Sequence, residues 1–376
     1  MTITCIESVL NSSYPGIEFD TNGVSNIAAA FKFNTLPVLQ NLQKNQDQIQ
    51  SLIAKIKAAG KGKEFDCLIG LSGGVDSSFM CHLAVKEWGL RPLVFHVDGG
   101  WNSRIAVSNI NNLVDCLGVE LHTEVVNWKQ MRDFQLAMFK SGVPHLDVPQ
   151  DIAFVSVLYK FALDYGIKFI FNGGNIATEG VPRPLKYIYW GSDKLHINDI
   201  LRRFHGPPLK NFTMTSAFYQ KAYLPYVRRK KVIKPLNFIP YSKEIANDTL
   251  KRLYGWNTYE QKHFESVFTR FFEGYWLKTR FGFDMRTVDL SSLVLTGQIT
   301  RESAMDSLST DNYLAASSNK DFAYVADKLG ISEDELRSYH AMPLRYYFDY
   351  KNLASVFNLA ERAFKFFGKA TRGGAY

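Results

Sequence analysis

The sequence predicts an α/β fold, in which helices cover both faces of a parallel sheet and a mostly helical C-terminal region follows. From residue 64 onward, short apolar runs alternate with helical stretches, and strands that are separated by helices pair in parallel. From Ser242 onward the pattern is mostly helical. With 376 residues, of which 46% are hydrophobic, the chain can bury a full core as one large domain with an extension, or as two domains.

Three parts are expected along the chain: residues 1–60, a nucleotide-binding domain over 61–240, and a helical region over 241–376. In the first part, the turn signals Pro15-Gly16 and Asn22-Gly23 predict a small hairpin over 14–24. A helix is expected over 36–59, and Gly60-Lys61-Gly62 predicts a flexible join to the next domain.

The central part carries the strand and helix alternation. Strands are expected at 65–71, 92–98, 120–127 and 168–172, with helices at 76–89, 104–117, 129–140 and 150–165. Beyond Gly180 the alternation ends in a basic, aromatic segment rich in proline, which is typical of loops over a sheet edge. Further helices are expected at 258–280, 313–328, 332–340 and 350–366, followed by a mobile tail over 371–376.

The predicted helix over 258–280 carries a stripe of aromatic side chains. They are Phe264, Phe268, Phe271, Phe272, Tyr275 and Trp276. Their spacing is typical of a core face or a dimer surface rather than a binding site.

The segment Ser72-Gly73-Gly74-Val75-Asp76-Ser77-Ser78 lies between the first expected strand and its helix. Gly73 and Gly74 allow the backbone to approach a ligand, and Ser72, Ser77 and Ser78 place hydroxyls beside the N–H groups of a helix N-terminus. Such a loop is an anion cradle. It lacks the Lys of the GxxxxGK[ST] phosphate loop, so it suits pyrophosphate better than a β/γ-phosphate clamp. The competing interpretation is an ordinary turn rich in glycine and serine.

Two other expected strands also end in glycine pairs beside polar side chains, at Asp98-Gly99-Gly100 and at Asn172-Gly173-Gly174. In a parallel sheet the ligand lies at the carboxyl ends of the strands. Asp76, Asp98 and Glu179 are therefore candidates for holding Mg²⁺, which prefers oxygen ligands. Taken singly, each carboxylate could equally cap a turn or a helix.

Charge is distributed unevenly along the chain. The net charge is +8, yet the segment 183–286 alone holds 20 Lys and Arg against 8 Asp and Glu, a net charge of +12. This segment suits an anionic partner, either a nucleotide-linked substrate or RNA, although a solvated basic face would look the same. Neither a membrane span nor a secretory signal is visible, and four scattered cysteines form no disulfide framework, so a cytoplasmic location is expected.

The motif SGGVDSS resembles the pyrophosphate loop of the N-type ATP pyrophosphatases, which cleave ATP between its α and β phosphates. The resemblance implies an adenine nucleotide alpha-hydrolase-like (HUP) core. Further blocks narrow the family: HVDGGWNS (96–103), FNGGNIATEG (171–180), IPYSKEIA (239–246), KHFESVFTRFFEGYW (262–276) and LSSLVLTGQITRESA (290–304). Together they resemble the WbpG-like N-acetyl sugar amidotransferases of lipopolysaccharide and O-antigen biosynthesis.

This resemblance implies an enzyme that adenylates an acetamido carbonyl of a UDP-linked sugar and replaces AMP by ammonia; the expected substrate is UDP-2,3-diacetamido-mannuronic acid. It implies ATP and Mg²⁺ as cofactors. The expected nucleotide-binding residues are Leu71, Ser72, Gly73, Gly74, Ser77, Ser78, Val97, Asp98, Asn172, Gly173 and Gly174. The expected catalytic residues are Asp76, Ser77, Lys234 and Lys262, although each lysine could instead be a solvated surface residue.

Partners follow from the same resemblance. No cysteine lies in a readable nucleophile context, so ammonia is expected from a separate glutaminase with a channel partner of the histidine-pathway type. No membrane partner and no nucleic acid are expected. Two alternatives stay open: a tRNA-modifying enzyme with the same loop, and a module that binds ATP or AMP without turnover.

The N-terminus departs from the family pattern. Family members usually carry four cysteines here, consistent with a zinc site, whereas the matching positions of this chain are Cys5, Ser8, Ser25 and Ala28. Serine and alanine cannot replace thiolates as soft ligands, so zinc is not expected.

Overall fold

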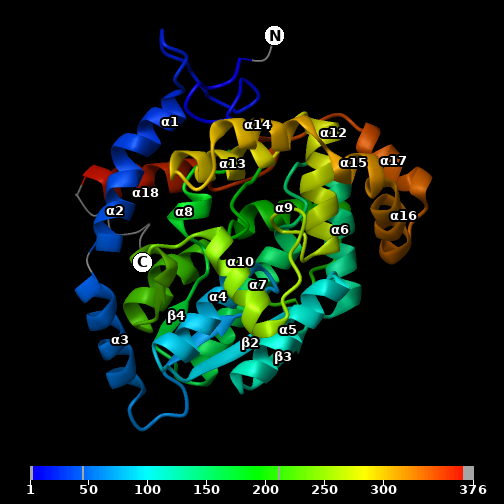
Figure 1. Cartoon of the computed structure of the whole chain (residues 1–376). Helices are drawn as coiled ribbons and strands as arrows, with labels where there is room; N and C mark the ends of the chain where they lie inside the picture. Colours follow the sequence, from blue (N-terminus) through cyan, green and yellow to red (C-terminus); the bar gives the residue numbers. More distant parts are fainter. Residues whose placement is uncertain (1–2, 45, 211, 367–376) are drawn as a thin grey trace.

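The structure is a computed structural model that describes residues 3–44, 46–210 and 212–366. At its centre lies a five-stranded parallel sheet in the order β3-β2-β1-β4-β5 (Figure 1). The strands are β1 (Cys67–Gly70), β2 (Pro92–Asp98), β3 (Leu121–Val125), β4 (Phe169–Phe171) and β5 (Lys231–Ile233). β1 is the central strand, with Cys67 aligned to Pro92 of β2 on one side and to Phe169 of β4 on the other.

Alternate residues of the strands serve two separate cores, because successive side chains point to opposite faces of a sheet. On one face, Ile69 and Val94 pack with α4 (Val75–His82), the π-helical turn η2 (Leu83–Glu87) and α5 (Arg104–Leu117). On the other face, Leu68 and Phe95 pack with α7 (Val148–Asp164) and the helical segment η3 (Tyr219–Val227). The predicted fold class, a parallel α/β sheet with a mostly helical C-terminal region, is confirmed.

The edge strand β5 is absent from the sequence prediction, which places only four strands. Its residues follow the charged run Arg228-Arg229-Lys230 and include exposed Lys231, a composition that suits an edge strand. The same composition lacks the apolar run from which a strand is predicted. Lys230 is buried, and its ammonium group donates to the carbonyls of Ala162 (2.6 Å) and Ile167 (2.8 Å). The basic run is therefore used partly to hold the sheet edge against α7.

The N-terminal part differs in detail from its prediction. The expected hairpin is a single antiparallel bridge between Phe19 and Ser25. The expected helix over 36–59 is divided into α2 (Leu36–Lys44) and α3 (Gln46–Gly60), and residue 45 is outside the described residues. An unpredicted helical stretch, α1 (Asn26–Ala30) with η1 (Phe31–Thr35), begins after Ser25 because the Ser25 hydroxyl accepts from Ala28 N at its start.

The four positions that match the family's cysteines lie together in the fold. Cys5, Ser8, Ser25 and Ala28 are all completely buried. The Ser25 amide donates to Cys5 Sγ (3.3 Å), and the Ala28 amide donates to Ser25 Oγ (3.1 Å). A hydrogen-bonded cluster occupies the place where the family pattern has thiolates, and its single sulfur does not fit tetrahedral zinc.

The predicted helix over 258–280 begins later than expected. Helical structure starts with α11 (Val267–Phe271) and continues through η5 (Phe272–Trp276) and α12 (Leu277–Phe281). Ser266 caps this start, since its hydroxyl accepts from Thr269 N (3.2 Å), and the preceding residues form a loop in which His263 has a φ of +65°. The aromatic stripe belongs to the core, as expected: Phe268, Phe271 and Trp276 are fully buried.

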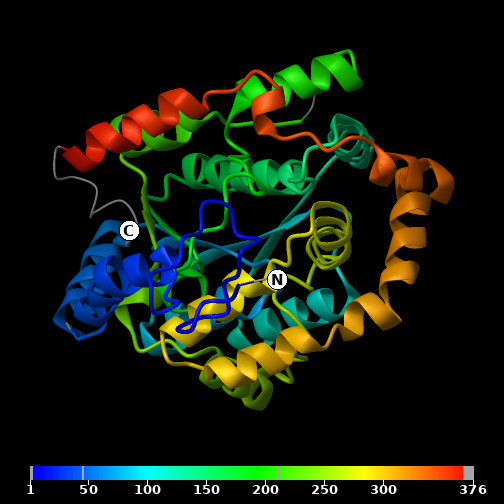
Figure 2. The same cartoon turned by 90° about the horizontal axis from the view of Figure 1, so that it is seen from above.

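The remaining helices frame the sheet. They are α6 (Trp128–Ser141), α8 (Ile176–Glu179), α9 (Lys194–Phe204), the short turn η4 (Pro235–Phe238), α10 (Lys243–Tyr254), α13 (Arg286–Leu295), α14 (Arg301–Ser309), α15 (Asn312–Ala316), α16 (Ser318–Leu329), α17 (Glu333–Ala341), the turn η6 (Tyr347–Asp349) and α18 (Ala354–Phe366). Seen from above, the gold and orange segments α14 to α17 curve around one side of the molecule (Figure 2). None of the helices in the described ranges has both the length and the apolar character needed to cross a bilayer. The predicted tail over 371–376 lies outside the described residues, and the domain boundaries at 60 and 240 stay predictions.

Candidate active site

The loop between β1 and α4 has the geometry of an anion cradle. Gly73 adopts a φ of +86°, and a Cβ there would lie 2.9 Å from Ala106 Cβ, so only glycine fits without strain. Gly74 precedes the first residue of α4, where the backbone N–H groups lack intrahelical partners. The Ser72 hydroxyl accepts from Gly74 N (3.1 Å), and the Ser77 hydroxyl donates to Gly74 O (3.1 Å). These two hydrogen bonds fix the conformation of the loop.

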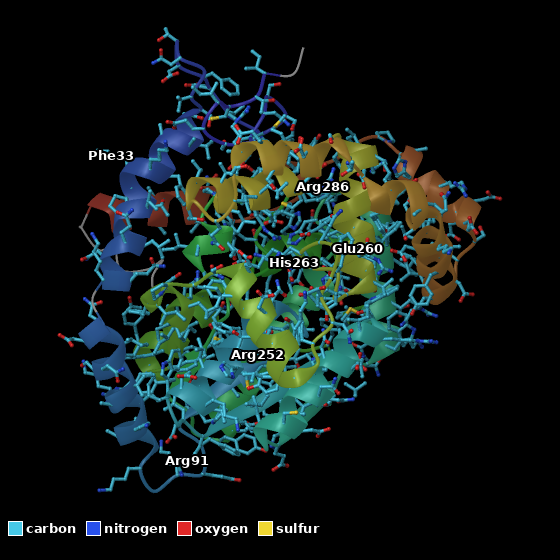
Figure 3. The ribbon with its side chains drawn as sticks, viewed as in Figure 1. Phe33, Arg91, Arg252, Glu260, His263 and Arg286 are labelled. Atoms are coloured by element: carbon cyan, nitrogen blue, oxygen red, sulfur yellow. The ribbon has the colours of Figure 1, made fainter. Side chains whose placement is uncertain are left out.

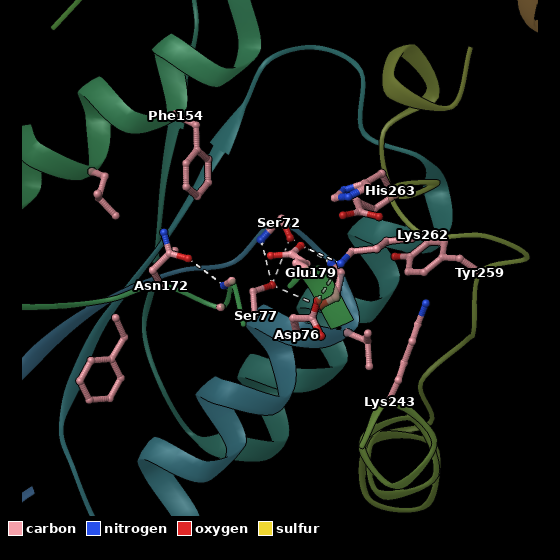
Figure 4. A pocket seen from close by; sticks show the side chains of 18 of the residues that line it. Ser72, Asp76, Ser77, Phe154, Asn172, Glu179, Lys243, Tyr259, Lys262 and His263 are labelled. Atoms are coloured by element: carbon pink, nitrogen blue, oxygen red, sulfur yellow. Dashed lines mark hydrogen bonds and ion pairs between the residues drawn. The ribbon is translucent and has the colours of Figure 1, made fainter. Parts of the chain in front are cut away.

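Asp76, Glu179 and Lys262 form one ionic cluster beside this loop. Lys262 Nζ lies 2.7 Å from Glu179 Oε1 and 3.8 Å from Asp76 Oδ2. The three side chains come from α4, α8 and the loop before α11, and Lys262 points toward both carboxylates in Figure 4. Tyr241 donates a hydrogen bond to Asp76 Oδ1. A cation and two carboxylates therefore converge where the helix N-terminus favours anions.

Burial and Lys262 set the ionisation of this cluster. Burial raises the pKa of the Asp76 carboxyl, while Lys262 opposes that rise. Burial also acts to raise the pKa of Glu179, but Lys262 and Arg183 outweigh it, so that pKa is lowered. For Lys262, the two carboxylates overcome the burial that would lower its pKa, and the pKa is raised. Lys262 is therefore a permanent cation in the pH range of the cell.

A cavity of about 320 Å³ opens over the loop; we call it the glycine-loop cavity. Its apolar end is formed by Phe154, Val155, Leu158, Ile170 and Phe171. Its polar end holds the ionic cluster together with Lys243, Tyr259 and Glu265. An apolar slot that leads to an anion cradle is the arrangement that a nucleotide requires, with the base in the slot and the phosphates at the loop.

The loop over 258–266 supplies polar groups that sequence analysis missed, because it predicts helix there. Tyr259 donates its hydroxyl to Gly73 O (2.7 Å). His263 Nε2 accepts from Arg183 (2.7 Å), and burial together with Arg183 lowers the pKa of His263 well below its usual value, which keeps the ring neutral. Burial raises the pKa of Glu265 to about 7. The positive φ of His263 has no signal in the sequence.

Lys243, at the start of α10, was also not singled out from the sequence. It lines the polar end of the glycine-loop cavity, and Figure 4 shows it on the same side as Lys262 and Tyr259. Burial, reinforced by the charge of Lys262, lowers the pKa of its ammonium group. The block IPYSKEIA contains both Tyr241 and Lys243, so the block itself was the available signal.

The structure brings most of the predicted site residues together. The glycine-loop cavity is lined by Ser72, Gly74, Asp76, Ser77, Asn172, Gly173, Gly174, Glu179 and Lys262. Lys234 stands near them, because its Cε would lie 3.8 Å from a Cβ built on Gly174. Gly173 is needed for close approach, since a Cβ there would lie 3.1 Å from Ser77 N. These contacts join the ends of β1 and β4, as expected for a parallel sheet.

Other predicted residues lie elsewhere. Leu71 and Ser78 are completely buried and do not line the glycine-loop cavity. Val97 lines a neighbouring cavity of about 270 Å³ that also contains Asp147 and shares Ser72, Phe154, His263 and Glu265 with the first. Asp98 is engaged in its own loop, where it accepts from Gly100 N (2.8 Å) and Asn102 Nδ2 (3.1 Å). The roles of these residues in nucleotide binding stay predictions.

The predicted magnesium ligands do not form a trio. In the described part of the chain, no group of three or more His, Cys, Asp and Glu side chains is arranged to hold a metal ion. Asp76 and Glu179 share Lys262, whereas Asp98 is held in the loop after β2. A magnesium ion at the phosphates needs only one or two protein carboxylates, and Asp76 and Glu179 fit that requirement.

A third cavity of about 410 Å³ adjoins the site on its C-terminal side, and we call it the C-terminal cavity. It shares Lys243, Gln261 and Lys262 with the glycine-loop cavity. The rest of its wall comes mainly from η5, α12, α13 and the segments beside α14. In Figure 3, Arg286 of this wall is above His263 and Glu260 in the view.

Comparison with known families concerns this C-terminal wall. Residues 265–363 match the WbpG-like family. The matching model is described as LPS biosynthesis protein WbpG-like, C-terminal domain, and it covers less than half of the chain. The WbpG-like segment begins at Glu265 in the polar end of the glycine-loop cavity and includes α11 to α17. The resemblance inferred from the sequence is confirmed for this segment.

Comparison with solved structures returns matches of low similarity. NMN synthetase from Francisella tularensis is 14% identical, with a TM-score of 0.29, over 58% of this chain and 98% of that chain. The tRNA thiolase NcsA from Methanococcus maripaludis is 14% identical, with a TM-score of 0.32, over 92% of this chain and 91% of that chain. NH3-dependent NAD synthetase from Campylobacter jejuni is 14% identical, with a TM-score of 0.25, over 70% and 96%. No curated protein sequence matches the chain.

Proposed function

We propose that this protein is an ATP-dependent N-acetyl sugar amidotransferase of lipopolysaccharide biosynthesis. The observation that carries the proposal is the convergence of Lys262, Asp76 and the glycine loop in one cavity whose wall continues into the WbpG-like segment at Glu265. The cradle suits a leaving pyrophosphate, and the family of the C-terminal segment supports an acceptor from lipopolysaccharide synthesis.

The proposed reaction converts an acetamido group into an acetamidino group. An amide carbonyl is a poor electrophile, so its oxygen first attacks the α-phosphorus of ATP and pyrophosphate leaves. Ammonia then adds to the activated carbon, and AMP departs with the former carbonyl oxygen. One proton leaves the amide nitrogen as the O-adenylyl imidate forms, and one leaves the added ammonia as AMP departs, so the nitrogen of ammonia remains in the amidine. No covalent bond to the protein is required.

The protein's part in this chemistry is positioning and charge stabilisation. The N–H groups at the start of α4, with the hydroxyls of Ser72 and Ser77, would hold the leaving pyrophosphate. Lys262 would neutralise phosphate charge, supported by Lys243 and Lys234. Asp76 and Glu179 would hold Mg²⁺, which supplies further charge neutralisation when bound.

Ammonia would come from a separate glutaminase with a channel partner of the histidine-pathway type. Cys5, Cys67 and Cys81 are buried and Cys116 is exposed on α5. In the described part of the chain, none of them lines the three cavities. This arrangement supports an external nitrogen source, with UDP-2,3-diacetamido-mannuronic acid as the proposed acceptor.

The test is a turnover assay with ATP, Mg²⁺, ammonium and this nucleotide sugar. We expect pyrophosphate, AMP and a product in which NH replaces one amide oxygen. With heavy oxygen in the acetamide carbonyl, the label should appear in AMP. Asp76→Ala should abolish turnover. Pyrophosphate release that depends on tRNA and ignores the sugar would instead identify a tRNA-modifying enzyme, and no release with any acceptor would indicate a module that only binds nucleotide.

A further inference from the structure

Charged side chains that contact one another form part of the wall of the C-terminal cavity. Four charged side chains form a network in its wall: Lys278 contacts Asp284 (3.0 Å) and Asp311, while Arg286 contacts Asp284 (2.7 Å) and Asp311 (3.6 Å). All four are only partly exposed, with side-chain exposures between 16% and 26%. These groups are largely satisfied within the protein, since Arg286 also donates to the carbonyls of Ser307 (3.1 Å) and Thr310 (2.8 Å), and Asp311 accepts from Leu314 N (3.0 Å). The network therefore fixes the shape of this wall.

An apolar surface completes the cavity. Phe264, Met285, Leu290 and Leu293 line it together with the charged network. The ring of the proposed acceptor has a matching character, because its C–H bonds and acetamido methyl groups are apolar while its polar substituents lie around the rim. The volume of about 410 Å³ falls within the range of about 300–1,000 Å³ that is usual for small-molecule sites.

The charges around the cavity are nearly balanced. Its lining holds five carboxylates, Glu260, Glu273, Asp284, Asp289 and Asp311, against four cations, Lys243, Lys262, Lys278 and Arg286. The cations Lys278 and Arg286 are already compensated by Asp284 and Asp311. Arg183 lies 3.1 Å from Glu273 and 3.9 Å from Asp289, so these two carboxylates are compensated by a cation outside the lining. The charges of the cavity therefore nearly balance, and the single carboxylate of the uronic acid ring meets no net negative charge there.

The C-terminal cavity lies next to the site proposed for the nucleotide. The C-terminal cavity and the glycine-loop cavity share the lining residues Lys243, Gln261 and Lys262, so the two cavities adjoin at these residues. Most of the opposite wall belongs to the WbpG-like segment, the part of the chain with a family match.

We propose that the C-terminal cavity binds the pyranose ring of the acceptor, with its reacting acetamido group directed at the junction formed by Lys243, Gln261 and Lys262. The proposal rests on the proposed function, since it assigns the acceptor subsite of that reaction. The nucleotide part of the acceptor would extend outward, away from the carboxylates of the cavity.

Leu293→Trp tests the assignment, because Leu293 lines the C-terminal cavity and not the glycine-loop cavity. We expect the KM for the UDP-linked diacetamido sugar to rise by at least about tenfold, with the KM for ATP unchanged. Leu293→Met keeps the volume and should retain the wild-type KM. Val294→Trp is the matched control on the same helix, since Val294 lines neither cavity.

Equilibrium binding separates this inference from the proposed function. Calorimetric titration with the same UDP-linked sugar, in the presence of an ATP analogue that cannot be cleaved between its α and β phosphates, needs no turnover. Wild type that binds the sugar and Leu293→Trp that does not would support the assignment even if no product forms. Equal sugar binding by the two proteins, a loss shared by Val294→Trp, or no sugar binding by wild type would overturn it. The melting temperature of each variant shows whether it is folded.

Discussion

The ammonium nitrogen of Lys262 lies 2.7 Å from Glu179 Oε1. Lys262 belongs to the loop before α11 and Glu179 to the last position of α8, so this ion pair joins the C-terminal region to the end of β4. The same nitrogen lies 3.8 Å from Asp76 Oδ2 on α4. One lysine therefore compensates two partly exposed carboxylates at the phosphate end of the glycine-loop cavity, and both its structural and its catalytic importance can be tested.

Lys262→Met should impair stability and turnover together. Removing Lys262 leaves two partly exposed carboxylates without their cation, and because Glu179 is 32% exposed the cost should lie below the roughly 3–5 kcal/mol of a fully buried pair. Loss of a cation aimed at developing charge should lower kcat by about two to three orders of magnitude. Denaturant unfolding and pyrophosphate release measure the two effects. Lys251→Met, at an exposed lysine of α10, is the control and should change neither. Near-normal kcat in Lys262→Met would remove Lys262 from the catalytic residues.

Gly73→Ala should lower the affinity for ATP in addition to the stability that is lost through backbone strain. A φ of +86° costs a non-glycine residue about 1–2 kcal/mol, and the added Cβ would also lie 2.9 Å from Ala106 Cβ. Gly62→Ala is the matched control, because Gly62 has a φ of +75° but no atom within 4 Å of the added Cβ. Both variants should lose stability, while only Gly73→Ala should lose ATP affinity in calorimetry. An equal ATP affinity for the two variants would contradict the cradle.

The sequence predicted the sheet side of the site well and the C-terminal side poorly. β2 and α5 have the bounds that their patterns predict, because buried apolar runs and amphipathic spacing are local signals. β5 was missed because its residues are basic and its strand character comes from pairing with β4 across 60 residues of chain. That pairing has no local signature.

Single residues in the polar end of the glycine-loop cavity also owe their positions to contacts that have no local signature in the sequence. Lys262 was predicted within a helix, yet it acts from a loop, since the Ser266 cap and the left-handed His263 delay the start of helical structure. Tyr241, Lys243 and Glu265 reach the site only through tertiary packing, so their sequence blocks indicated a family but not a role. Asp98 follows β2 as expected, but its own loop takes up its carboxylate.

Metal removal should leave the N-terminal part unchanged. Cys5, Ser8, Ser25 and Ala28 form a buried cluster with one sulfur, which does not fit zinc. The melting temperature should therefore be the same with a chelator and with added zinc. The triple variant S8C/S25C/A28C places three more sulfurs around Cys5 and should gain a zinc-dependent rise in melting temperature. A chelator-sensitive wild type would show that another group of residues binds a structural metal.

Asp147→Asn should change the pH dependence of stability, because Asp147 is buried beside a second carboxylate. Burial, followed by repulsion from Asp151, raises the pKa of Asp147 from 3.8 to about 6, although Thr269 donates to its carboxylate (2.5 Å). An acid whose pKa is raised by folding binds its proton more tightly in the native state. Between pH 4 and pH 6, the native protein therefore holds a proton that the unfolded chain releases, and stability falls as pH rises.

Replacing Asp147 by asparagine removes this titration while keeping the size of the side chain. The free energy of unfolding of Asp147→Asn, relative to wild type, should rise from pH 4 to pH 7 by no more than about 3 kcal/mol, since one pKa unit corresponds to about 1.4 kcal/mol. Comparing the two proteins at each pH cancels the titration of groups that do not interact with Asp147. Denaturant titrations across this range measure the difference. A gap between the proteins that stays constant with pH would show that Asp147 titrates alike in the folded and unfolded chains, so that its burial does not control its ionisation.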